Sequence, residues 1–226
     1  MTARNIPLAI ILAPIALGAA LVAPALSGES PLRVVTISGQ AEVQRTGVPA
    51  WIAATLRAEL PPGGAARTLR GRLTLGTASG QSLRLAPASR LALAEAGAAD
   101  QPTRTKLIGG SVWVAVLPAS PRPEQIEVET GAVTCTVKGG GVGLSLERDV
   151  SGLVRVYHGA AECAGTSVDR RWTRTLTEGR ELLVPSGGPP GESRALVMDK
   201  LEAAWVKWNE DQDRAGGYGG KTTPAR

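Results

Sequence analysis

The residues of this sequence that could carry out chemistry are few and form no familiar catalytic pattern. Among its 226 residues there is one histidine, His158, which we interpret as a structural or surface residue because a catalytic or metal site needs convergent groups. No nucleophile elbow, zinc-protease helix, P-loop or dinucleotide fingerprint occurs. The run Lys138–Gly141 lacks the flanking strand and helix of a phosphate-binding loop, so we interpret it as a β turn. We therefore expect a non-catalytic protein that uses no cofactor and no metal ion.

The stretch 106–165 repeats one local pattern, a glycine followed by alternating apolar residues. Gly110, Gly131 and Gly159 each precede such a run, which is typical of a chain that turns tightly and re-enters a sheet. Successive side chains of a strand point to opposite faces. The alternation around Cys135 therefore predicts that its side chain points inward.

Arginines alternate with leucines between residues 69 and 93. We expect Leu69, Leu73 and Leu75 to share a buried face while the intervening arginines lie on the solvent face. Arg84, between two leucines, is interpreted in the same way. The alternative is an anion-binding ladder made of the four arginines of these strands, Arg70, Arg72, Arg84 and Arg90.

The composition favours a sheet. Hydrophobic residues make up 43% of the chain and include no Phe, so the core must consist mostly of Val, Leu and Ala. The run Gly110–Val116 is apolar on both faces and predicts a central strand that buries Trp113. We predict an all-β fold, with a rolled or sandwich-like, antiparallel-rich sheet domain over residues 33–185. The net charge of +5 is scattered and indicates a solvated surface, with attraction to anionic lipid or an acidic partner as the alternative.

Residues 1–28 decide the compartment. The segment Ile6–Leu26 is almost entirely apolar over 21 residues, enough to span a hydrocarbon core of about 30 Å at about 1.5 Å per residue. We favour a retained single-pass anchor in the inner membrane, with the N-terminus in the cytoplasm and the domain in the periplasm. A cleaved signal peptide is the alternative. Both interpretations export the domain, which argues against a nucleic-acid partner. Small residues such as Gly18 and Ala19 would allow close contact with another membrane helix.

Export makes the two cysteines informative. Cys135 and Cys163 lie 28 positions apart, each in a similar place within a glycine-led strand. An even pair in an oxidising compartment predicts a disulfide, and two buried free thiols are the alternative.

After the sheet, the sequence predicts a linker over residues 186–192, an amphipathic helix over 193–215 and a flexible tail over 216–226. Ser193 is the candidate N-cap, and the regular part of the helix runs from Leu196 to Arg214. An apolar stripe follows helical spacing at Val197, Met198, Leu201, Ala204, Trp205 and Trp208. We expect the stripe to pack on its own domain. Contact with a membrane interface or another subunit is the alternative, which would place Met198, Leu201, Trp205 and Trp208 against a partner.

Several of these segments together resemble the FecR domain. They are Ile37–Val43 (ISGQAEV), Gln81–Leu93 (QSLRLAPASRLAL), Gly109–Val116 (GGSVWVAV), Val128–Val133 and Val154–Cys163 (VRVYHGAAEC). The segment Trp205–Arg214 is similar to the ending that often follows such domains. One departure is Gly139-Gly140, where the family commonly has a Gly-Thr pair. The resemblance implies an all-β, extracytoplasmic domain used for sensing or protein contacts.

In the regulators that named the family, a longer cytoplasmic segment engages a sigma factor. About five residues would remain in the cytoplasm here, so that role does not carry over. Our first hypothesis is a membrane-tethered periplasmic module that recognises an envelope protein or polymer through its β surface. The second is a structural accessory subunit of a larger integral-membrane complex, held by its transmembrane helix and its periplasmic domain. An envelope hydrolase is the least favoured class.

Overall fold

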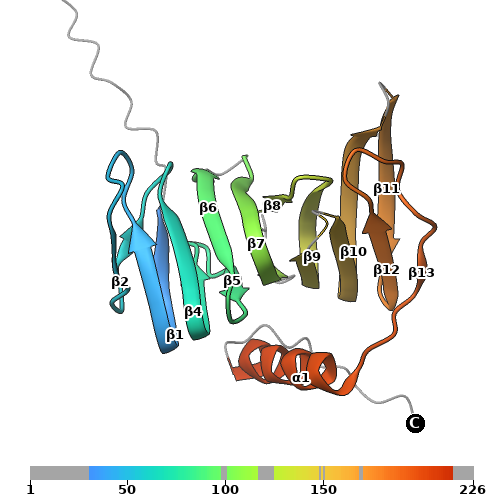
Figure 1. Ribbon diagram of the computed structural model, residues 1–226. Coiled ribbons are helices and arrows are strands. Elements are labelled where there is room, and N and C mark those ends of the chain that lie inside the picture. Colours follow the sequence, from blue (N-terminus) through green and yellow to red (C-terminus); the bar gives the residue numbers. More distant parts are fainter. Residues whose placement is uncertain are drawn as a thin grey trace, which may run out of the picture.

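The computed structural model describes residues 31–97, 101–116, 125–147, 149, 151–167 and 170–215. Within these ranges the chain forms thirteen strands and one helix (Figure 1). The strands are β1 (Leu32–Gln44), β2 (Trp51–Ala53), β3 (Glu59–Leu60), β4 (Ala65–Gly76), β5 (Ser82–Leu85), β6 (Arg90–Glu95), β7 (Thr103–Val116), β8 (Ile126–Glu129), β9 (Thr134–Leu146), β10 (Gly152–Ser167), β11 (Arg170–Thr177), β12 (Arg180–Val184) and β13 (Arg194–Ala195), and the helix is α1 (Lys200–Ala215). The predicted all-β class is confirmed.

All strands belong to one sheet, whose main path runs β13-β12-β10-β9-β8-β7-β5-β4-β1-β2. The pairings are antiparallel except for β7 with β8, which is parallel. The long strands use their two halves differently, since β7 pairs with β6 and β8 through its first half and with β5 and β9 through its second. Side chains from both halves enter one apolar core rich in Leu and Val. The sheet therefore folds around a single core, whose Leu and Val content the composition predicts.

Two of the glycines predicted to open strands lie inside strands instead. Gly110 is within β7 and Gly159 is within β10, both with positive φ (+76° and +77°). A Cβ on Gly159 would lie 2.3 Å from the carbonyl oxygen of Gly139 on the neighbouring strand. Left-handed backbone at these positions lets a long strand bend without ending. Only Gly131 sits between strands, in the connection from β8 to β9. The Lys138–Gly141 run is likewise part of β9 and not a turn.

A register shift changes the predicted faces of β4. Leu73 and Leu75 are buried, but Leu69 is 46% exposed. The pairing of β1 with β4 skips Leu69, because Gln40 is opposite Arg70 and Ala41 is opposite Thr68. This extra residue reverses the alternation, which no sequence period reveals. Trp113, by contrast, is fully buried as predicted.

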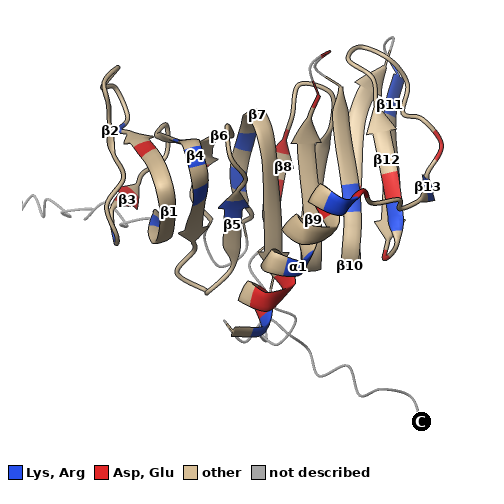
Figure 2. Ribbon diagram, turned by 60° about the horizontal axis from the view of Figure 1, so that its bottom comes forward, with Lys and Arg blue, Asp and Glu red and all other residues tan. Residues whose placement is uncertain are grey.

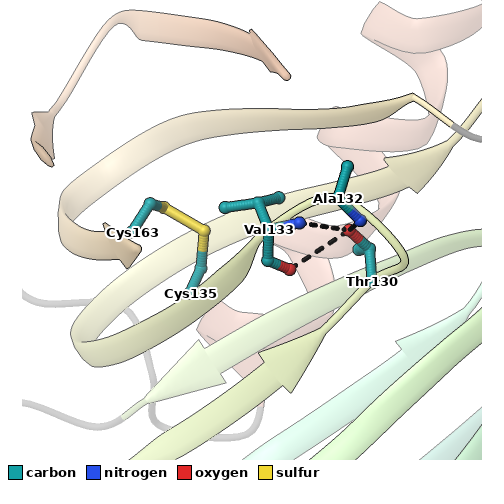
Figure 3. The surroundings of a disulfide bond; sticks show 5 residues. All are labelled: Thr130, Ala132, Val133, Cys135 and Cys163. Atoms are coloured by element: carbon teal, nitrogen blue, oxygen red, sulfur yellow. Dashed lines mark hydrogen bonds between the residues drawn. A yellow bond between two sulfur atoms is a disulfide. The ribbon is translucent and has the colours of Figure 1, made fainter. Parts of the chain in front are cut away.

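The predicted disulfide is present. Cys135 on β9 and Cys163 on β10 are directly opposite, with their Cα atoms 4.1 Å apart (Figure 3). The turn before β9 is fixed by Thr130, whose Oγ1 accepts hydrogen bonds from the backbone N–H groups of Ala132 (3.2 Å) and Val133 (3.1 Å). Both sulfur-bearing residues lie in the core.

The helix begins at Lys200, not at Leu196, and its cap is not Ser193. The Asp199 carboxylate accepts a hydrogen bond from the backbone N–H of Glu202 (2.8 Å) and takes the capping role. Ser193 instead accepts a bond from Arg180 (3.2 Å). The residues that follow it form β13 against β12, which holds the chain extended up to the helix.

No helix in the described ranges is long and apolar enough to cross a bilayer. The predicted anchor, Ile6–Leu26 with Gly18 and Ala19, and the predicted tail, 216–226, lie outside those ranges. Membrane attachment and its orientation therefore stay predictions.

Candidate protein-interaction site

The helix α1 lies across the strands with its axis transverse to them (Figure 1). The strand face toward α1 is defined by one row of residues that are neighbours in register on four strands, namely Arg155 on β10, Gly143 on β9, Trp113 on β7 and Arg84 on β5. We call these four residues the docking row. It carries two arginines and one tryptophan, and α1 carries both acidic and basic residues along its length (Figure 2).

A buried ion pair fixes the C-terminal half of α1. Arg84 Nη1 lies 2.5 Å from Asp213 Oδ1, and Asp213 Oδ2 accepts a hydrogen bond from Trp113 Nε1 (3.2 Å). Arg84 is 3% exposed, so its predicted place on the solvent face is wrong. Alternation correctly puts Arg84 on the outer side of the sheet, but it cannot show that a helix far along the chain covers that side. Burial raises the pKa of Asp213, and the ion pair with Arg84 opposes this shift.

The docking row has room for two aromatic rings because β9 carries glycines there. Trp113 and Tyr157 stack with their ring centroids 4.8 Å apart. A Cβ on Gly141 would lie 2.6 Å from the Trp113 ring, and one on Gly143 would lie 3.0 Å from Tyr157. The two rings thus occupy the space above these glycines, and Val206 of α1 packs on them. This explains the Gly-rich run of β9, which the sequence alone led us to interpret as a β turn.

A chain of charges fixes the N-terminal half of α1. Glu202 accepts a hydrogen bond from the Tyr157 hydroxyl (2.8 Å) and pairs with Arg155 (2.6 Å). Arg155 also pairs with Glu181 (2.8 Å), which in turn pairs with Arg194 (2.5 Å). Burial raises the pKa of Tyr157 far above its ordinary value, so the hydroxyl stays protonated. Burial alone would raise the pKa of Glu181, but the hydrogen bonds from Arg155 and Arg194 outweigh it and lower that pKa.

The two tryptophans of α1 face an arginine. Trp205 and Trp208 stack on each other with their centroids 5.3 Å apart, and the Arg72 guanidinium lies 4.4 Å from the Trp208 ring. His158 is half-exposed, and its Nε2 lies 3.1 Å from Glu210 on α1. The histidine thus has the surface position expected of it. The arginines of the alternative anion-binding ladder do not form one site. Arg84 and Arg72 contact α1, whereas Arg90 lies against Trp51.

The predicted apolar stripe forms only part of the packing face of α1, since Trp205 packs beside Val206 and both tryptophans face Arg72. The buried residues of the helix are Val206, Asn209 and Asp213. Two of the three are polar, and Asp213 is buried because it pairs with Arg84 of the docking row. Other stripe residues point to solvent: Val197 is 72% exposed, Met198 43% and Leu201 84%. We call these three the apolar patch. Sequence analysis missed Asp213 and Asn209 because a hydrophobic criterion ignores polar residues, although their spacing from Val206 is helical.

The surface beside α1 is hollowed on one side. A hollow of about 300 Å³ lies beside its N-terminal half, between Leu201 and Trp205 on the helix and Ser111 and Ser145 on the sheet. In the described ranges, no three His, Cys, Asp or Glu side chains cluster in a way that could hold a metal ion. The charged side chains of the docking row pair with those of α1 or of β12 and thereby position the patch.

Comparison with known proteins supports the family resemblance. The FecR protein family matches residues 66–162, which include the docking-row residues on β5, β7, β9 and β10. None of the curated proteins matches the chain. Two crystal structures are similar, each of "a putative anti-sigma factor" from Parabacteroides distasonis ATCC 8503, with TM-scores of 0.50 and identities of 14% and 15%. Each comparison covers 62% of this chain and 62% of the other, so the chain spans less than two thirds of those proteins. At such identities the likeness shows the fold alone.

Proposed function

We propose, from the match of residues 66–162 to the FecR protein family, that this chain is a regulatory or sensing module that works by contacting another protein. The apolar patch is the observation that carries the proposal. Its three side chains lie within five positions, Val197 to Leu201, and all are exposed. Adjacent exposed aliphatic side chains of this size are typical of protein contact sites.

The anchoring of α1 strengthens this proposal. The ion pair of Arg84 with Asp213 and the bonds from Tyr157 and Arg155 to Glu202 hold both halves of the helix on the sheet. Leu201 therefore projects from a fixed helix, and Val197 and Met198 lie in the short connection between β13 and that helix, so binding costs the patch little ordering entropy. A patch on a free tail would lose much more entropy.

We further propose that the module is tethered to the membrane and faces the periplasm. The apolar segment Ile6–Leu26 is long enough for the tether. The Cys135–Cys163 disulfide is the kind of bond that persists in an oxidising compartment. A sigma-factor-binding role is not part of the proposal.

Extraction of native membranes with a mild detergent, followed by sizing, tests the proposal. We expect the chain to elute with a protein partner and the double variant Met198→Ser, Leu201→Ser to elute alone. Leu56→Ser is the matched control, since Leu56 is 63% exposed but lies outside the patch. Elution with a large membrane assembly would favour the accessory-subunit role. A wild-type chain that elutes alone under these conditions contradicts the proposal.

A further inference from the structure

A second cluster of aromatic and charged side chains lies outside the α1 interface. Two guanidinium groups lie against the ring of Trp51 on β2, that of Arg67 on β4 at 4.3 Å and that of Arg90 on β6 at 5.0 Å from the ring centroid. Trp51 is half-exposed and Arg90 is exposed, so a ligand can reach the cluster from solvent. Neither the hydrophobic core nor α1 uses these three side chains.

The two arginines oppose each other across the sheet. Arg67 and Arg90 are direct partners in the pairing of β4 with β6. Like charges at directly opposite positions are destabilising, so this arrangement needs a compensating interaction. Stacking on Trp51 supplies part of it, since an indole ring attracts guanidinium groups.

Nearby carboxylates compensate only one of the two charges. Arg67 pairs with Glu42, through its Nη2 at 2.5 Å and its Nε at 2.6 Å. Arg90 makes no ion pair with any carboxylate of the described ranges. Two positive groups and one negative group leave one positive charge in the cluster.

We propose that Arg67 and Arg90 form a binding site for a phosphodiester group, with Trp51 as its wall. A phosphodiester carries one negative charge, which matches the residual charge of the cluster. Its two non-bridging oxygens can each accept from one guanidinium, and guanidinium groups bind phosphate oxygens with good geometry. The bound group neutralises the repulsion between the two arginines. This inference does not depend on the proposed protein partner.

Thermal unfolding of the full chain in detergent micelles tests the site. At matched ionic strength, dimethyl phosphate should raise the melting temperature relative to chloride. Arg90→Gln should melt higher than the wild type without phosphodiester, because the repulsion is gone, and should no longer respond to dimethyl phosphate. Arg70→Gln is the matched control, because Arg70 is exposed on β4, the strand of Arg67, but lies opposite Gln40 and not opposite an arginine. It should respond as the wild type does.

A binding measurement accompanies this test, because Arg90→Gln also removes a contact with Trp51. The indole N–H resonance of Trp51 should shift on titration with dimethyl phosphate. Arg90→Lys keeps the positive charge but loses the forked N–H donors of the guanidinium. It should weaken the binding of dimethyl phosphate at least about tenfold.

The outcomes separate the sources of the group. A response to dimethyl phosphate supports a free phosphodiester. A response to phosphatidylglycerol bilayers alone, and not to phosphatidylcholine bilayers or dimethyl phosphate, supports a lipid headgroup. An equal response to acetate overturns the phosphodiester assignment. The site itself is overturned if Arg90→Gln keeps the response, or if Arg70→Gln loses it to the same extent.

Discussion

At the scale of single residues, the glycines of β9 decide how α1 can dock. Gly141 leaves room for the Trp113 ring, which a Cβ would approach to 2.6 Å. We predict that Gly141→Ala displaces this ring and lowers the free energy of unfolding by about 1–3 kcal/mol, as overpacking does. Gly139→Ala is the matched control, because a Cβ there meets nothing within 4 Å. Urea unfolding of the two variants checks this, and equal losses would contradict it.

Glu181 gives the stability a pH dependence of known sign. Its pKa is lowered in the folded chain, so its contribution is present above the ordinary glutamate pKa of about 4.3 and is lost as the pH falls through the lower folded value. We predict that Glu181→Gln is less stable than the wild type at pH 7 and that the difference disappears in acid. Denaturant unfolding at several pH values measures this. Glu162→Gln, which removes an exposed pair with Lys138, should show little difference at any pH.

The sequence predicts the position and burial of some residues correctly and of others wrongly. The pairing of Cys135 with Cys163 and the burial of Trp113 follow from local alternation and from the small number of cysteines. Arg84 does not, since alternation identifies the side of the sheet but not what covers that side. The predicted burial of Leu69 is wrong for a different reason, because one bulged residue in β4 reverses the two faces of that strand.

At the scale of elements, α1 is held by charges more than by apolar burial. We predict that Asp213→Ala releases the C-terminal half of the helix, because the buried Arg84 would lose the carboxylate that balances its charge, at a cost of up to about 3–5 kcal/mol. Hydrogen exchange of α1 and protease cleavage within residues 186–199 should both become faster.

The control for this prediction lies on the same helix. Among the described residues, Asp211 pairs with Lys207 and Arg214, both on α1 itself, so Asp211→Ala should leave α1 docked. Replacing Arg84 and Asp213 together by leucine should restore protection, since no buried charge remains. A helix that stays protected in Asp213→Ala would show that the ion pair does not hold it.

The amphipathic pattern of α1 predicts the helix but not its contacts. Its existence follows from helical spacing, whereas its start at Lys200 depends on the cap at Asp199, in the connection that follows the two-residue strand β13. Its packing face follows from a docking row assembled by four strands, which the helix sequence alone cannot reveal.

At the scale of the whole molecule, the composition and the repeated strand pattern predict one all-β domain. The sequence does not predict that the long strands continue through Gly110 and Gly159, because a glycine before an apolar run indicates a turn and a bend equally well. The order of strands in the sheet also depends on pairings between distant segments, which local periodicity does not encode.

The disulfide contributes to the stability of the whole domain because it closes a chain loop spanning 28 positions. We predict that replacing Cys135 and Cys163 by serine lowers the free energy of unfolding by about 3–4 kcal/mol in the chain-entropy model. The wild type measured with a reductant should then match the variant measured without one. Identical stability of the variant and the oxidised wild type would exclude a structural role for the bond.

The claim that the apolar patch contacts a protein is tested most directly by photocrosslinking in intact cells. A photoreactive amino acid at position 201 should give a discrete adduct with one protein, and the same amino acid at position 56 should give none. A chain that forms no adduct from position 201, or the same adducts from both positions, would contradict the account.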